Sequence, residues 1–183
     1  MKHCQLSFKA AYRKAYSTQH VLIRLVEEWK SKLDNDFLVG SVFMDLSKAF
    51  DSIPHELIIA KLHAYGFDEN ALVLIHSYLK KRKQSVRINN VYSSIQRMVS
   101  GVPQGSVLGP IIFNFYINDL FFFYKASKNI HLCWWWYASS LLQVIAGTRQ
   151  GLEDEAGNAL SWLDQNEMIA NPNKFHTFFV KKD

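Results

Sequence analysis

Hydrophobic positions along this chain switch between the spacing of a helix and the spacing of a strand. Apolar residues recur every three or four positions from Val21 to Leu33, and Ser17 or Thr18 can cap that segment, so the pattern predicts a first helix. The next segment, Phe37 to Leu46, is rich in Val, Phe and Leu and predicts a buried strand. The same reasoning predicts two further helices, at about residues 51–66 and 68–81.

The second half of the chain mixes helical and strand patterns. Apolar and polar residues alternate on both sides of Asn89-Asn90, and because Asn tolerates positive φ this predicts a β-hairpin within residues 85–100. Helices interleaved with antiparallel hairpins predict an α+β fold in one unit. The other expected elements are a helix at 106–124, two strands within 130–145, a helix at 152–166 with Ala156, Leu160 and Leu163 facing inward, a turn at Asn171-Pro172-Asn173, and a last strand at 175–180.

The composition favours a folded globular domain. The chain has 183 residues and is 49% hydrophobic, which suits one well-buried core. Its net charge of +5 favours a polyanionic partner. Cys4 and Cys133 form no CxxC pair, so neither a disulfide framework nor a zinc knuckle is expected. Polar residues and a proline interrupt the apolar stretch 107–124, and no signal peptide is evident, so we expect a soluble intracellular protein, nuclear or cytoplasmic, with no membrane partner.

Two segments carry candidate chemistry. Residues 42–51 read VFMDLSKAFD and place Asp45 near the end of the predicted strand, where a carboxylate on rigid backbone could bind a divalent cation. Residues 100–110 read SGVPQGSVLGP, whose glycines would let the backbone approach a nucleotide and whose Gln104 offers a donor. A P-loop is excluded because the Lys-Ser/Thr pair is missing, and the spacing is wrong for a nucleophile elbow.

These two segments, in this order, resemble core motifs of the reverse transcriptases of non-LTR retrotransposons of the LINE type, of the jockey or CR1 kind. Further similarity lies in residues 13–18, 55–57, 66–67 and 161–175, so it covers nearly the whole chain. The resemblance implies an RNA-directed DNA polymerase, a nucleotidyltransferase, with an RNA template, a DNA primer and dNTP as partners. It also implies a polymerase palm with part of the fingers, in which residues 1–36 form a fingers-side helix and residues 37–183 the palm, while the upstream fingers and the thumb are absent.

The resemblance also assigns roles to individual residues. Asp45 is expected to be a catalytic residue that binds Mg²⁺ or Mn²⁺, and Lys174 is expected to act as a general acid, although a solvated loop lysine is an equal alternative. Phe50 is expected to pack under the sugar of the nucleotide, with core packing as the alternative, and Gln104 and Gly105 are expected to bind the nucleotide.

The third motif of the family departs from its usual form. Two adjacent Asp are due at a hairpin tip, but the chain reads WYASSL, so Ser139 and Ser140 occupy the positions of both carboxylates. Because Ser is neutral and a weak metal ligand, we expect a catalytically inactive domain. A non-enzymatic module that binds RNA or an RNA–DNA hybrid, a non-functional relic, and a local sequence error are alternatives that the sequence leaves open.

A basic run follows the predicted helix 68–81. It could be a solvated helix end, where cations also suit the macrodipole, or a nucleic-acid contact. The residues expected to contact nucleic acid are Lys80, Lys81, Arg82, Lys83 and Arg87.

Overall fold

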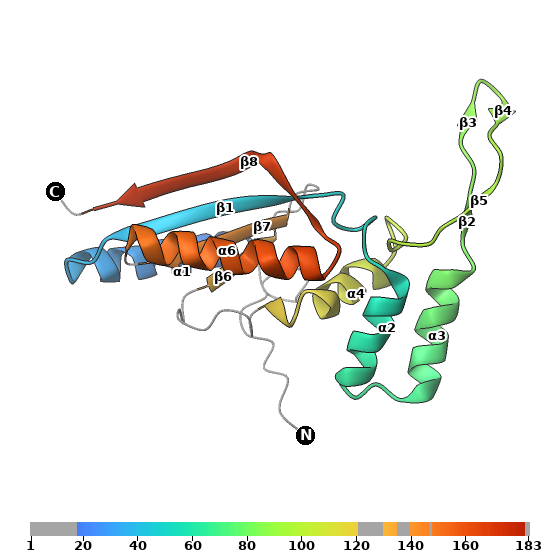
Figure 1. Cartoon of the computed structure of the whole chain (residues 1–183), viewed down its shortest axis with the longest axis horizontal. Coiled ribbons are helices and arrows are strands. Elements are labelled where there is room, and N and C mark those ends of the chain that lie inside the picture. The colour runs from blue at the N-terminus through green and yellow to red at the C-terminus, as the bar shows by residue number, and fades with distance from the viewer. Residues whose placement is uncertain (1–17, 121–129, 135–139, 147, 182–183) are drawn as a thin grey trace. The chain divides into compact units, whose positions relative to one another are not determined.

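The computed structural model describes residues 18–120, 130–134, 140–146 and 148–181 (Figure 1). These residues form two compact units. The first combines the described residues of Met1–Ala49 and Asn118–Asp183, and the second is the continuous segment Phe50–Ile117. Within the described residues, no helix has both the length and the apolar character needed to cross a membrane.

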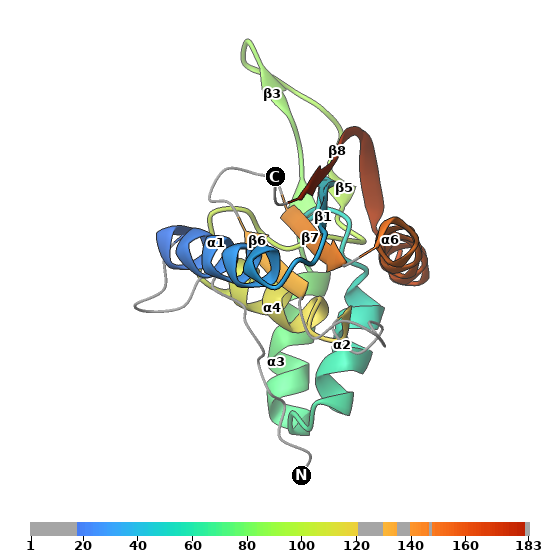
Figure 2. The same cartoon turned by 90° about the vertical axis from the view of Figure 1, so that its left-hand side faces the viewer.

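The first unit is built on a four-stranded antiparallel sheet. Its strands lie in the order β6 (Ile130–Trp134), β7 (Ser140–Ala146), β1 (Val39–Ser47) and β8 (Ile169–Val180). Helix α1 (Thr18–Asp34) and helix α6 (Arg149–Gln165) lie on opposite sides of this sheet (Figure 2). A strand that is covered on both faces needs apolar residues at nearly every position, which explains the almost continuous burial of β1.

Contacts on the two faces of β1 show how closely the layers pack. On the side of α1, the Phe178 ring lies 5.2 Å from the Trp29 ring and 5.2 Å from the Phe43 ring. At Gly40, an added Cβ would lie 2.8 Å from the Phe179 ring and 3.1 Å from the Leu152 side chain. Gly40 therefore allows β8 and α6 to approach β1 closely.

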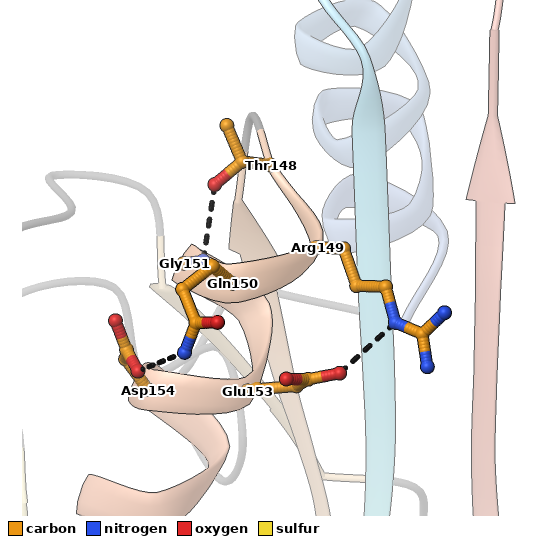
Figure 3. Close-up of polar contacts among 6 residues, drawn as sticks. All are labelled: Thr148, Arg149, Gln150, Gly151, Glu153 and Asp154. Atoms are coloured by element: carbon orange, nitrogen blue, oxygen red, sulfur yellow. Dashed lines mark hydrogen bonds and ion pairs between the residues drawn. The ribbon is translucent and has the colours of Figure 1, made fainter.

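Local side-chain interactions fix the start of α6 (Figure 3). The Thr148 side chain accepts a hydrogen bond of 3.0 Å from the Gly151 N–H and so caps the helix. In the first turns, Arg149 pairs with Glu153 at 3.0 Å, while the Gln150 amide donates to Asp154. Each pair is separated by four positions, which places its members on one side of the helix.

The second unit contains helices α2 (His55–Ala64), α3 (Glu69–Lys80) and α4 (Leu108–Tyr116), and a long β-hairpin between α3 and α4. Asp68 caps α3 by accepting a hydrogen bond of 2.9 Å from the Ala71 N–H. Lys61 ties α2 to α4, because its ammonium donates to the Tyr116 carbonyl at 2.8 Å. The hairpin contains two short ladders, which pair β2 (Lys83–Gln84) with β5 (Gln96–Arg97) and β3 (Arg87–Ile88) with β4 (Val91–Tyr92).

Most predicted elements are confirmed, with boundaries displaced by a few residues. The hairpin turns at Asn89-Asn90, where φ is 46° and 66°, as the pattern of the chain predicts. One prediction about a helix face is wrong. Leu160 is 41% exposed and Ala156 is half-buried, because α6 turns Trp162 and its neighbours toward the sheet. On α1, Leu22 and Val26 remain 45% and 43% exposed.

Two predicted boundaries are also wrong. The helix expected at 106–124 ends at Tyr116, and Asn118-Asp119 follows in a turn, because such side chains compete for backbone hydrogen bonds. The expected turn at Asn171-Pro172-Asn173 instead lies inside β8, which begins at Ile169.

Candidate active site

Asp45 lies near the end of the central strand β1 and is 4% exposed. Its Oδ1 atom is buried and has no hydrogen-bond partner among the described residues. A buried carboxylate oxygen without a partner is costly, and such atoms commonly mark a place where a cation or another donor binds. The rigid strand therefore holds an acidic group that is ready to accept a further ligand.

Lys174 is brought to Asp45 by an irregularity in β8. The pairing of β1 with β8 shifts between Phe43↔His176 and Asp45↔Asn171, so β8 carries extra residues opposite this point. Pro172 lies in that irregular stretch, where its missing N–H leaves no ladder hydrogen bond unmade. As a result the Lys174 ammonium reaches the Asp45 Oδ2 atom at 3.1 Å, while the Lys174 side chain stays 60% exposed.

The hairpin expected to carry the third motif shares a sheet with Asp45. Strand β7 pairs with β1 through Met44↔Leu142, and Ser140 is the first residue of β7. Strand β6 pairs with β7 as far as Trp134↔Ser140. The backbone at Ser140 thus lies at the same end of the sheet as Asp45, whereas Ala138 and Ser139 lie outside the described residues.

The donors at this end of the sheet do not fit a two-metal site. Such a site needs several carboxylate oxygens around ions that lie roughly 3.5–4 Å apart. The orphaned Asp45 Oδ1 suits one ligand position, but the sequence has Ser139 and Ser140, whose hydroxyls are neutral, where the two other carboxylates are due. Within the described ranges, no three His, Cys, Asp or Glu side chains are grouped to hold a metal ion.

In the second unit, the end of the first sequence motif lies against the start of the second motif. The Gly101 N–H donates to the Ile53 carbonyl at 2.8 Å, and the Val102 N–H donates to the Phe50 carbonyl at 2.8 Å. Gly101 has a φ of +79°, and an added Cβ there would lie 2.7 Å from the Asp51 carbonyl oxygen. The segment after the first motif and the start of the second motif are therefore interlocked through their backbones.

Side chains strengthen this interlock. The Gln104 amide donates to both carboxylate oxygens of Asp51, at 2.9 and 3.1 Å. The Gly101 carbonyl accepts from the Arg82 guanidinium at 2.6 Å and lies 2.8 Å from the His55 Nε2 atom. Sequence reasoning placed Asp51 only at the start of a helix, and no local signal could have found a partner that is 53 positions away.

The other predicted nucleotide-binding residues also lie in the second unit. The Phe50 ring packs at 4.8 Å from the Phe113 ring, which supports the core-packing role that the sequence allowed. Gly105 is exposed and has a φ of +75° with no atom near the position of a Cβ. The expected contacts of Phe50, Gln104 and Gly105 with a nucleotide stay predictions.

Some residues of the basic run contact other parts of the second unit, and others are exposed to solvent. The Lys80 ammonium lies 2.8 Å from Glu56, and this hydrogen bond, followed by the charge of Lys80, holds the pKa of the Glu56 carboxyl below its ordinary value. Arg82 is held by the Gly101 carbonyl. Lys81, Lys83 and Arg87 are exposed.

Comparison with known proteins decides the family. The profile described as reverse transcriptase (RNA-dependent DNA polymerase) matches residues 12–182. The chain belongs to the reverse transcriptase family. It is 35% identical over 109 residues to the probable RNA-directed DNA polymerase from transposon BS of Drosophila melanogaster, and 29% identical over 113 residues to that from mobile element jockey. The matches cover 60% and 62% of this chain but 12% of each relative, so the chain spans a small part of their length.

Solved structures support the fold. The structure of apo telomerase from Candida tropicalis, truncated from its C-terminal domain, covers 91% of this chain and 36% of its own chain, with a TM-score of 0.68 and 15% identity. At that identity the likeness shows the fold alone, an α+β polymerase palm with neighbouring fingers elements. The predicted fold class is thereby confirmed, and the profile match together with the transposon relatives supports the predicted family.

Proposed function

We propose that this reverse transcriptase domain is the palm of an RNA-directed DNA polymerase and that, with the present sequence, it does not synthesise DNA. The observation that carries the proposal is the buried Asp45, which lies in one sheet with strands β6 and β7 and has one oxygen without a partner among the described residues. Asp45 retains the position of a metal-binding carboxylate, whereas Ser139 and Ser140 replace the pair expected opposite it.

The remaining residues keep the roles that the family resemblance implies. Lys174 would lie beside the leaving pyrophosphate, and its 3.1 Å contact with Asp45 supports a place at the same site. Phe50, Gln104 and Gly105 would contact the incoming dNTP. A bound pair of Mg²⁺ or Mn²⁺ ions would activate the primer hydroxyl and neutralise the triphosphate, but no three His, Cys, Asp or Glu side chains of the described residues are grouped to hold such ions.

The first test restores the missing carboxylates. Ser139→Asp with Ser140→Asp adds two negative charges at the positions that the family motif places opposite Asp45, so the variant should lose stability in chelator. Mg²⁺ that binds the folded state should then restore it, by about 1.4 kcal/mol at ten times the dissociation constant. The measurement is thermal unfolding with and without Mg²⁺.

Ser139→Asn with Ser140→Asn is the matched control, because it has the same side-chain shape without charge. Neither the control nor the parent chain should respond to Mg²⁺. If the Asp variant is equally indifferent to Mg²⁺, the assignment of these positions to a metal site is wrong.

The second test is primer extension with Mg²⁺ or Mn²⁺ on the parent chain. Electrostatic stabilisation by the metal pair is worth several kcal/mol of barrier, so its loss should slow synthesis by on the order of a thousandfold or more. We expect no detectable product. Incorporation at a rate typical of active polymerases would contradict the proposed inactivity.

A second candidate function is binding of RNA or an RNA–DNA hybrid without catalysis. Lys81, Lys83 and Arg87 support it, because they are exposed cations on one segment of the second unit. Lys80 and Arg82, which the sequence also suggested, are engaged with Glu56 and the Gly101 carbonyl. RNA template and DNA primer would be the natural partners of such a surface in this family.

A further inference from the structure

The hairpin that runs from Lys83 to Arg97, here called the cationic hairpin, extends beyond α2 and α3 of its own unit (Figure 1). Each of its residues is exposed. A two-stranded ribbon of this kind buries little apolar surface and gains little stability by itself. The hairpin therefore contributes a surface rather than a core.

The charge on this surface has one sign. No Asp or Glu occurs in the sequence between Glu69 and Asp119, whereas Lys83, Arg87 and Arg97 lie on the hairpin itself. Lys83 is paired directly opposite Arg97 in the ladder between β2 and β5. Like charges placed opposite each other destabilise a sheet, and an anion that bridges them removes that cost.

The base of the hairpin is anchored by other cations. Arg82 donates to the Gly101 carbonyl at 2.6 Å, and its own carbonyl accepts from the Met98 N–H at 3.1 Å. Lys80 is held by Glu56 at 2.8 Å. Arg82 thus ties the base of the hairpin to the Gly101 segment, while Lys80 links the end of α3 to α2, so the cations beyond them are presented from a supported base.

Aromatic and apolar side chains alternate with the cations. The Arg87 guanidinium lies 5.5 Å from the centre of the Tyr92 ring, which is itself 61% exposed. At the tip, Ile88 and Val91 are paired and are 67% and 72% exposed. Exposed rings and apolar side chains between cations suit a ligand that has both phosphates and flat bases.

We propose that the cationic hairpin binds the phosphodiester backbone of a nucleic-acid strand, with Lys83, Arg87 and Arg97 as phosphate contacts and Tyr92 as a stacking contact. A second copy of this chain is a poorer occupant, because two surfaces of the same sign repel. The inference rests on the proposed function for the nature of its partner, since a reverse transcriptase must hold template and primer. It does not depend on DNA synthesis.

The test compares two triple variants of equal net charge. Lys83→Gln, Arg87→Gln and Arg97→Gln remove the hairpin cations. The control variant removes three exposed cations elsewhere, by Lys30→Gln, Arg149→Gln and Lys181→Gln. Fluorescence anisotropy measures binding of labelled RNA, DNA and RNA–DNA hybrid oligonucleotides of about 20 nucleotides at 50 and 200 mM salt, with chelator and without dNTP.

For a single strand, each phosphate contact contributes about 0.7 to the slope of log affinity against log salt. Loss of three contacts should lower that slope by about 2 and weaken binding at least tenfold at the lower salt. The control should change affinity by less than about threefold. The single-stranded and hybrid arms then show which form of nucleic acid the hairpin prefers.

A measurement on the unaltered chain covers the case in which a variant fails to fold. Acetylation of Lys83, followed by mass spectrometry, should slow several-fold when oligonucleotide is bound, while Lys30 should react at an unchanged rate. Equal losses of affinity in both triple variants, unchanged acetylation of Lys83, or binding to phosphatidylserine vesicles in place of nucleic acid would overturn the proposal. Absence of primer extension would leave it standing.

Discussion

Substitution of Gly101 by Ala tests the interlock between the two sequence motifs. At Gly101, φ is +79° and the added Cβ would lie 2.7 Å from the Asp51 carbonyl oxygen and 2.8 Å from the Asp51 Cα atom. Both of these atoms belong to the backbone, so no side chain can turn aside to make room. The two segments must separate by several tenths of an ångström.

The expected cost has two parts. A non-glycine residue at this φ costs about 1 kcal/mol. Separation of the two segments adds about 1–3 kcal/mol, because it strains the 2.8 Å hydrogen bonds from Gly101 to Ile53 and from Val102 to Phe50. We therefore expect Gly101→Ala to lower the free energy of unfolding by about 2–4 kcal/mol, which is a large share of the stability of an ordinary domain.

Gly105→Ala is the matched control. Gly105 has a similar φ of +75°, but no atom of the described residues lies within 4 Å of the position of its Cβ. It should therefore lose about 1 kcal/mol from the backbone term. Urea unfolding followed by circular dichroism measures both variants, and equal losses would refute the reasoning that the segment at Asp51 blocks a side chain at Gly101.

Two further predictions concern ion pairs. Lys174→Met should lower the free energy of unfolding by about 1–2 kcal/mol, because it leaves the buried Asp45 carboxylate without its 3.1 Å partner. Urea unfolding measures this loss. An unchanged urea midpoint would mean that solvent already satisfies Asp45. Lys80→Gln should raise the pKa of Glu56 toward its ordinary value, because the hydrogen bond from Lys80 and then its charge lower that pKa in the parent. Since the folded-state pKa of Glu56 is lowered, the pair's contribution is present at neutral pH and is lost as the pH falls through that pKa. NMR titration of the Glu56 carboxyl checks the shift, and an identical titration in both chains would contradict its cause.

Local pattern predicted the helices, the hairpin and the central strand well. The hairpin turn at Asn89-Asn90 could be placed from sequence, because those residues accept the positive φ that a tight turn needs. The side of α6 that faces the sheet could not be predicted from sequence. Its sequence allows Leu160 or Trp162 to face inward, and the burial of the larger Trp162 against the sheet decides between them.

The sequence by itself determined the family, the order of the elements and the place of Asp45 near a strand end, because motifs and periodicity depend on neighbours along the chain. It also shows two serines, Ser139 and Ser140, at the positions where the family motif has two Asp. Only the tertiary structure decided which distant groups meet. Lys174 reaches Asp45 because pairing between β1 and β8 shifts at this point, and that shift depends on the packing of whole strands.

The same limit applies to the second unit. The contact of Gln104 with Asp51 spans 53 positions, and the contact of His55 with Gly101 spans 46. No periodic pattern reports contacts at such separations, because they form only when the helices and the hairpin have packed. The sequence supplied the residues of this interlock, and the close approach of the two backbone segments decided that they act together.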